Sequence, residues 1–226
     1  MSLEYSRACH NAETIESLAN EMMQSVERLI EHCLEPAAGT LTPSDFPFVQ
    51  LGRSELAGLR TQLKGRRVEA IYPLISVQQE LLNQTRLSPA PGMWRTQVVL
   101  NLSGPLKPKV FRRAWERVLH EHPLLRSGFV SNQVSMPVQV VVGGVDIPWT
   151  EFDWRDVGDR REALARLCNE LLADAPPVDE GPLMRLALIK WSNTSFSLVL
   201  DNHHLVADGW SLGVIVRALA NAYEGI

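Results

Sequence analysis

The sequence predicts an α/β protein in which helices are layered on a mixed β-sheet, preceded by a helical tail. Beyond about residue 64 the apolar residues alternate between the two-residue period of strands and the 3.6-residue period of helices. Two apolar β runs, 183–191 and 195–201, are separated by the polar residues 192–194, which is typical of a hairpin. Before residue 64 the strongest pattern is one amphipathic helix.

Composition bounds the class of protein. The 226 residues are 45% hydrophobic and 21% charged, which suits one large domain or one and a half. The net charge is only -4 and the basic residues are scattered, so neither nucleic acid nor a membrane surface is an expected partner. The first twenty residues lack a continuous apolar run, and no later stretch reaches the ~20 apolar residues of a membrane span. We therefore expect a cytoplasmic protein.

The three cysteines, Cys9, Cys33 and Cys168, lie far apart and form no C-x-x-C motif or Cys/His cluster. Neither a disulfide framework nor a zinc site is expected, and the three residues are interpreted as reduced thiols.

The N-terminal part is predicted to hold two helices. Apolar residues at helical spacing cover 14–34, where Asn11 can cap the first turn and 35–39, with its proline and glycine, ends the helix. A second, shorter helix carries leucines after Ser54, which is expected to be its cap.

Between these two helices, residues 40–52 contain two prolines and no period, so an extended segment on the surface is expected. Its aromatic residues, Phe46 and Phe48, are predicted to dock in grooves. After the second helix, 64–67 (Lys-Gly-Arg-Arg) is interpreted as a solvated linker, and the domain boundary is placed there.

Beyond the boundary the pattern predicts a succession of helices and strands. The helices are expected over 76–85, 110–119, 160–173 and 212–223, and the strands over 94–102, 124–130, 138–142, 183–191 and 195–201.

The most informative motif is His203-His204-Leu205-Val206-Ala207-Asp208-Gly209, which lies between the last β run and the last helix. An unprotonated imidazole that faces a cleft can accept a proton from an attacking amine or hydroxyl. Because successive side chains diverge at a strand end, one histidine should face the cleft and the other pack away. Asp208 is close enough to tie the turn by a charged hydrogen bond, and Gly209 permits backbone conformations closed to other residues and could aim its amide at an oxyanion.

A purely structural interpretation is also open, in which these residues satisfy a turn and Ser211 caps the helix. The position of the motif at a strand-to-helix turn, where function concentrates, favours the chemical interpretation.

The motif resembles the H-H-x-x-x-D-G core motif of condensation domains from non-ribosomal peptide synthetases. Other motifs of that family are matched in the same order along 68–226: Tyr72-Pro73-Leu74 with Ser76 and Gln78, His122-Pro123-Leu124-Leu125-Arg126-Ser127-Gly128-Phe129, 137–149 and 182–189.

Upstream, Tyr5-Ser6-Arg7, the helix through His32-Cys33, and 42–47 resemble the closing tail of an upstream condensation-type or epimerization-type domain. The resemblances together predict that 1–63 is this tail, 64–70 a linker, and 71–226 the N-terminal subdomain of a condensation domain whose C-terminal subdomain is absent.

The resemblance implies a fold similar to chloramphenicol acetyltransferase, in which two subdomains form a V and the motif lies at the floor of the tunnel between them. It implies that His204 is the catalytic residue, as a general base or as an orienting and charge-stabilising group, while His203 and Asp208 are structural. Asp208 is expected to pair with Arg126, and Gly209 to lie close to the reacting carbonyl.

The resemblance also implies that no cofactor or metal is bound directly. Phosphopantetheine arms would be supplied by donor and acceptor peptidyl carrier domains, and adjacent synthetase domains would be further partners.

The predicted function is therefore amide-bond formation between a carrier-bound aminoacyl or peptidyl thioester donor and a carrier-bound aminoacyl acceptor. An epimerization-type domain uses a similar histidine motif for proton transfer at carbon, but Trp210-Ser211 after the motif favours condensation. The other alternative is a non-catalytic junction or docking fragment, because the second subdomain is absent. The face that would meet that subdomain is expected to be left exposed. Because sizeable apolar patches tend to be buried, self-association of the fragment is also predicted.

Overall fold

The computed structural model describes residues 4–34, 41–87, 90 and 92–226, which divide into two compact units, Met1–Thr42 and Pro43–Ile226. In the first unit, helix α1 spans Ala12–Leu34 and buries none of its residues. The Asn11 carboxamide accepts a hydrogen bond from the Glu13 amide at 3.1 Å, as expected of a cap. The segment 35–39, expected to end the helix, lies outside the described residues.

Residues 43–63 pack with the second unit, so the compact division falls about twenty residues before the boundary predicted from sequence. Here a 3-10 turn, η1 (Pro43–Asp45), precedes helix α2 (Arg53–Gln62). Phe46 is buried as predicted, but Phe48 is 69% exposed and does not dock in a groove. The Gln62 amide donates to Asp179 at 2.8 Å. Ser54 is not the cap of α2, because the Glu55 carboxylate accepts from the amide of the N-cap residue Gly52.

A three-stranded sheet follows, in the order β1 (Arg67–Pro73), β4 (Val138–Gly143) and β3 (Ser127–Val130), with both pairings antiparallel. The expected linker 64–70 is wrong from Arg67 onward, because these residues pair with β4 in a strand. The strand expected over 124–130 begins only at Ser127, since a 3-10 turn, η2, occupies Pro123–Arg126.

The larger sheet has four strands in the order β2 (Arg95–Ser103), β7 (Ser195–His203), β6 (Met184–Lys190) and β5 (Trp149–Asp153). The β6–β7 hairpin is confirmed, and β2 also pairs antiparallel with β7. β5 runs parallel to β6, so the sheet is mixed, as predicted. β7 lies in the interior of the sheet and all of its residues after Ser195 are buried.

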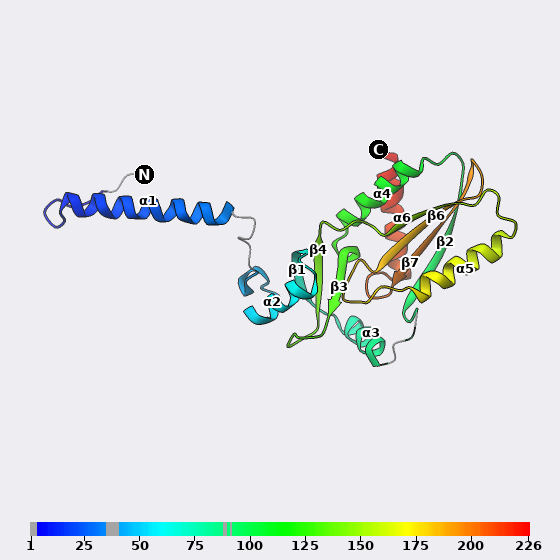
Figure 1. Ribbon diagram of the computed structural model, residues 1–226, viewed down its shortest axis with the longest axis horizontal. Helices are drawn as coiled ribbons and strands as arrows, with labels where there is room; N and C mark the ends of the chain where they lie inside the picture. The colour runs from blue at the N-terminus through cyan, green and yellow to red at the C-terminus, as the bar shows by residue number, and fades with distance from the viewer. Residues whose placement is uncertain (1–3, 35–40, 88–89, 91) are drawn as a thin grey trace. The chain divides into compact units, whose positions relative to one another are not determined.

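Helices cover both faces of this sheet (Figure 1). α4 (Pro108–Glu121) and α6 (Gly209–Glu224) pack together on one face, where Trp115 is fully buried against the even-numbered apolar residues of β6 and β7. α5 (Arg160–Ala173) covers the other face, where Leu167 packs against odd-numbered residues. α3 (Ser76–Leu87) lies beside the smaller sheet. Among the described residues, no helix has the length and apolar character needed to cross a membrane.

Candidate active site

The motif forms the turn between β7 and α6 and is fixed by its backbone. The His203 amide donates to the Leu183 carbonyl on one side at 3.1 Å, and the His204 amide donates to the Trp94 carbonyl on the other at 2.7 Å. The Val206 amide closes the turn on the His203 carbonyl at 3.0 Å. The two histidines are thus positioned by both neighbouring chain segments.

The His204 ring is half-buried and lines a cavity of about 380 Å³. Its Nε2 lies 3.0 Å from the Thr96 hydroxyl on β2. The Gln78 amide of α3 donates to the Leu205 carbonyl at 3.3 Å, which ties α3 to the turn beside that cavity. An imidazole that is oriented by a hydroxyl and faces a cavity can hydrogen-bond to, or accept a proton from, a bound amine.

His203 points to the opposite face of the sheet, as successive strand residues must. It is buried, and its Nδ1 accepts a hydrogen bond from the Leu205 amide at 3.1 Å. Burial lowers the pKa of the His203 imidazole to about 4, and the positive charges of Arg95 and His204 contribute, against a smaller opposite effect of Asp201. The His203 ring is therefore neutral at pH 7.

Asp208 is the N-cap of α6. Its carboxylate accepts from the Ser211 amide at 2.8 Å and from the Ser211 hydroxyl at 2.7 Å, and these two bonds hold its pKa below the ordinary value. Gly209 is exposed, its φ lies outside the left-handed region, and an added Cβ would meet nothing within 4 Å. The backbone freedom that the sequence suggested for Gly209 is therefore not used in this structure.

Arg126 does not pair with Asp208, contrary to the sequence-based expectation. Its buried guanidinium donates to the Leu119 carbonyl at 3.1 Å and the Val142 carbonyl at 2.9 Å, and its carboxylate partner is Glu69. The hydrogen bond from Arg126 lowers the pKa of Glu69. Glu69 lies on β1, which the sequence pattern places in a linker, so this partner could not be predicted.

A family model described as "Condensation domain" matches residues 68–226. The chain belongs to the condensation domain family.

Individual relatives agree with the family match. The chain is 31% identical over 270 residues to chondramide synthase cmdD of Chondromyces crocatus, covering 97% of this chain and 7% of that protein. It is 28% identical over 221 residues to bacitracin synthase 1 of Bacillus licheniformis, covering 96% of this chain and 4% of that protein. The chain therefore spans a small part of these synthases.

Solved structures of condensation domains share the fold. The starter condensation domain of rhizomide synthetase RzmA superimposes with a TM-score of 0.61 at 22% identity, over 68% of this chain and 38% of that one. A four-domain nonribosomal peptide synthetase, holo-AB3403, gives a TM-score of 0.61 at 20% identity, over 70% of this chain and 12% of that one. The predicted fold class and the predicted resemblance to condensation domains of non-ribosomal peptide synthetases are both confirmed.

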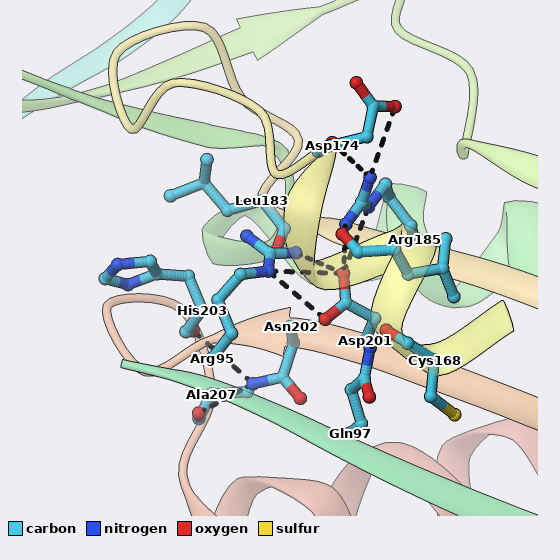
Figure 2. A network of polar contacts seen from close by, with 11 residues as sticks. Arg95, Gln97, Cys168, Asp174, Leu183, Arg185, Asp201, Asn202, His203 and Ala207 are labelled. Atoms are coloured by element: carbon cyan, nitrogen blue, oxygen red, sulfur yellow. Dashed lines mark hydrogen bonds and ion pairs between the residues drawn. The ribbon is translucent and has the colours of Figure 1, made fainter. Parts of the chain in front are cut away.

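This condensation-domain segment also contains a buried ion cluster that the sequence analysis missed (Figure 2). The Asp201 carboxylate accepts hydrogen bonds from Arg95 on β2 and Arg185 on β6, with shortest distances of 2.6 and 2.7 Å. The Arg95 and Asp201 side chains are 1% and 0% exposed. The sequence does contain a signal for this cluster, namely charged residues inside otherwise apolar β runs. A charge in a buried strand needs a partner of opposite sign.

Among the described residues, no group of three His, Cys, Asp or Glu side chains is placed to hold a metal ion. The thiols of Cys9, Cys33 and Cys168 are free, and burial raises the pKa of Cys168.

Proposed function

We propose that this segment supplies the motif-bearing half of an amide-forming site, with His204 as its catalytic residue. The observation that carries the proposal is the position of the His204 imidazole, which lines a cavity of about 380 Å³ while Thr96 holds its Nε2 at 3.0 Å. Orientation of this kind places a proton acceptor where an amine can approach a carbonyl.

In the proposed reaction an acceptor amine attacks the carbonyl carbon of a donor thioester. The C–N bond forms, the C–S bond breaks, and the proton lost by the nitrogen ends on the departing thiolate. His204 hydrogen-bonds the amine and stabilises the positive charge that develops on it during attack, whether or not it takes the proton fully. His203, Asp208 and Gly209 shape the turn, and Arg126 stabilises the smaller sheet through Glu69.

The substrates would arrive as thioesters of phosphopantetheine arms on donor and acceptor carrier domains, with adjacent synthetase domains as further partners. Condensation domains of synthetases work with such carriers, which supports this part of the proposal. Apolar side chains surround His204 in its cavity, among them Ile75, Trp94 and Leu124, which favours apolar groups on the bound substrate.

The N-terminal part supports the proposed junction with an upstream domain. The similarity to chondramide synthase cmdD includes 97% of the chain and so extends well before residue 68, where the family match begins. The apolar face of α1 is exposed, and the exposed fractions of Leu29 and Ile30 are 63% and 53%. Such a face is expected of a helix that packs against another part of a protein. Because 43–63 pack with the second unit, we propose that only residues 1–42 of the predicted tail 1–63 close an upstream condensation-type or epimerization-type domain. Self-association of the segment stays a prediction.

The test uses the complete condensation domain with loaded donor and acceptor carriers. His204→Ala should lower the rate of amide formation by about a hundredfold or more. His120→Ala is the matched control, because His120 is exposed at the end of α4 and should leave the rate unchanged. Equal rates for His204→Ala and the unaltered domain would overturn the assignment.

The same assay separates the alternatives. Exchange of the donor α-hydrogen with deuterated solvent, without amide formation, would indicate an epimerization-type site instead. If the unaltered complete domain forms no amide with any loaded pair of carriers, the junction interpretation is favoured.

A further inference from the structure

A second cavity, of about 480 Å³, lies beside the buried ion cluster and is lined by residues other than those around His204. Its walls come from the end of α3, from residues 90, 92 and 93 before β2, from the end of β3 and from the segment after α5. Arg95 and His203 both line it, and these two residues are register partners across β2 and β7. Figure 2 shows the two side chains together with the Asp201 cluster.

Each of these two side chains has a buried nitrogen that lacks a hydrogen-bond partner among the described residues. These atoms are Nη1 of Arg95 and Nε2 of His203. Trp115 and Asn202 also have an unpartnered atom, but neither residue lines this cavity. Two unsatisfied polar atoms on side chains that line one cavity point to a missing partner, because buried polar groups in proteins are almost always hydrogen-bonded.

Both unpartnered atoms are hydrogen-bond donors. The His203 Nδ1 accepts from the Leu205 amide, so in the neutral ring the proton resides on Nε2. The guanidinium of Arg95 can only donate. The missing partner is therefore a hydrogen-bond acceptor.

The charge of the surroundings favours an anion. One carboxylate, Asp201, is shared by two guanidiniums, those of Arg95 and Arg185, which leaves the buried cluster with a net charge of +1. Asp174 lies 3.8 Å from Arg185 but is 99% exposed, so water screens its charge. Arg86 and Asp179 also line the cavity and have opposite charges.

The rest of the lining sets the class of ligand. Apolar side chains dominate it, among them Met93, Phe129 and Val178. Two donors and one net positive charge suit the two oxygens of a carboxylate better than a dianionic phosphate. We propose that this cavity binds a small carboxylate with an apolar body, whose oxygens accept from Arg95 Nη1 and His203 Nε2.

The test titrates the full chain with N-acetyl-leucine and with its amide, which differ only at the carboxylate, while side-chain nitrogen signals are followed by NMR. N-acetyl-leucine should shift the signals of Arg95 and His203, whereas the amide and inorganic phosphate should not. Equal binding of acid and amide, or no binding of the acid at its solubility limit, would overturn the proposal.

Two variants sharpen the test. Arg95→Lys keeps the positive charge next to Asp201 but lacks Nη1, and it should weaken binding of N-acetyl-leucine by about tenfold or more. His204→Ala, which lines the other cavity, should bind it as the unaltered chain does. Failure of the proposed catalytic role is thus distinguishable from failure of this carboxylate site. If Arg95→Lys does not fold, the comparison of acid with amide on the unaltered chain still decides.

Discussion

The Thr96 hydroxyl and the His204 Nε2 meet at 3.0 Å, although they belong to segments far apart in the sequence. The backbone of the same strand region contributes as well, since the Trp94 carbonyl accepts from the His204 amide at 2.7 Å. The orientation of the motif's second histidine therefore depends on β2 and is not set by the H-H-x-x-x-D-G turn alone.

Thr96→Val should lower the rate of amide formation in the complete domain while leaving its folding intact. Valine keeps the shape of threonine but cannot bond to the ring, and loss of a net ~0.5–1.5 kcal/mol, the value of one hydrogen bond, corresponds to roughly twofold to tenfold in rate. The measurement is single-turnover amide formation with saturating loaded carriers.

Thr96→Ser is the matched control, because it retains the hydroxyl and should retain most of the activity. A Thr96→Val domain as fast as the unaltered one would show that the hydrogen bond does not position His204.

Arg126→Met should destabilise the second unit. The variant removes the hydrogen bonds to the Leu119 and Val142 carbonyls and leaves Glu69 without its main partner. Breaking a buried ion pair from one side costs about 3–5 kcal/mol, and the low end applies here because Glu69 is partly exposed. Urea unfolding at pH 7 measures the change in the free energy of unfolding.

Arg112→Met provides the control for Arg126→Met. Arg112 forms an exposed pair with Glu116 on α4, so its loss should change stability by less than about 1 kcal/mol.

The pKa of Glu69 is lowered in the folded protein, so the ionic contribution of its pair with Arg126 is present at neutral pH and is lost as the pH falls through the folded pKa. The difference between Arg126→Met and the unaltered chain should therefore shrink below about pH 4.

Arg126→Met and Asp208→Ala should be additive in stability, because Arg126 bonds to Glu69 and Asp208 bonds to Ser211. Asp208→Ala alone removes the cap of α6 and should cost about 1 kcal/mol. A double-mutant cycle at pH 7 should give a coupling energy within about 0.5 kcal/mol of zero. A coupling energy well above that value would indicate that Arg126 and Asp208 interact, as expected from the sequence.

The elements that the sequence predicted well are those with a strong local pattern. The apolar stripes of α4, α5 and α6 and the β6–β7 hairpin were recognised because each buries one side along a continuous run. β1 was missed because the basic residues at its start suggested a solvated linker, and its pairing with β4 joins segments about seventy residues apart. β5 was missed because it is a short edge strand whose five residues are all exposed or half-buried.

The candidate site divides in the same way. The motif and its place between a strand and a helix could be predicted, because they depend on adjacent residues. The long-range partners could not be predicted: these are the carboxylate that pairs with Arg126, the hydroxyl that contacts His204 and the arginines that pair with Asp201. Glu69, Thr96 and Arg95 lie on strands whose neighbours are fixed by the fold. Residue type alone does not specify pairings over such separations.

The buried His203 should make the second unit less stable at pH 5 than at pH 7. Its pKa is lowered to about 4 in the folded protein against an ordinary value near 6.5, so between these values the unfolded chain binds the proton and the folded chain does not. The free energy of unfolding contributed by this residue is present above about pH 6.5 and is lost as the pH falls towards 4, by about 2 kcal/mol between pH 7 and pH 5. His203→Asn removes the titrating group while its amide oxygen can still accept from the Leu205 amide. Urea unfolding of both proteins at the two pH values should show the smaller loss for His203→Asn, because the other titrating groups are common to both. An equal loss would show that His203 does not titrate with a lowered pKa.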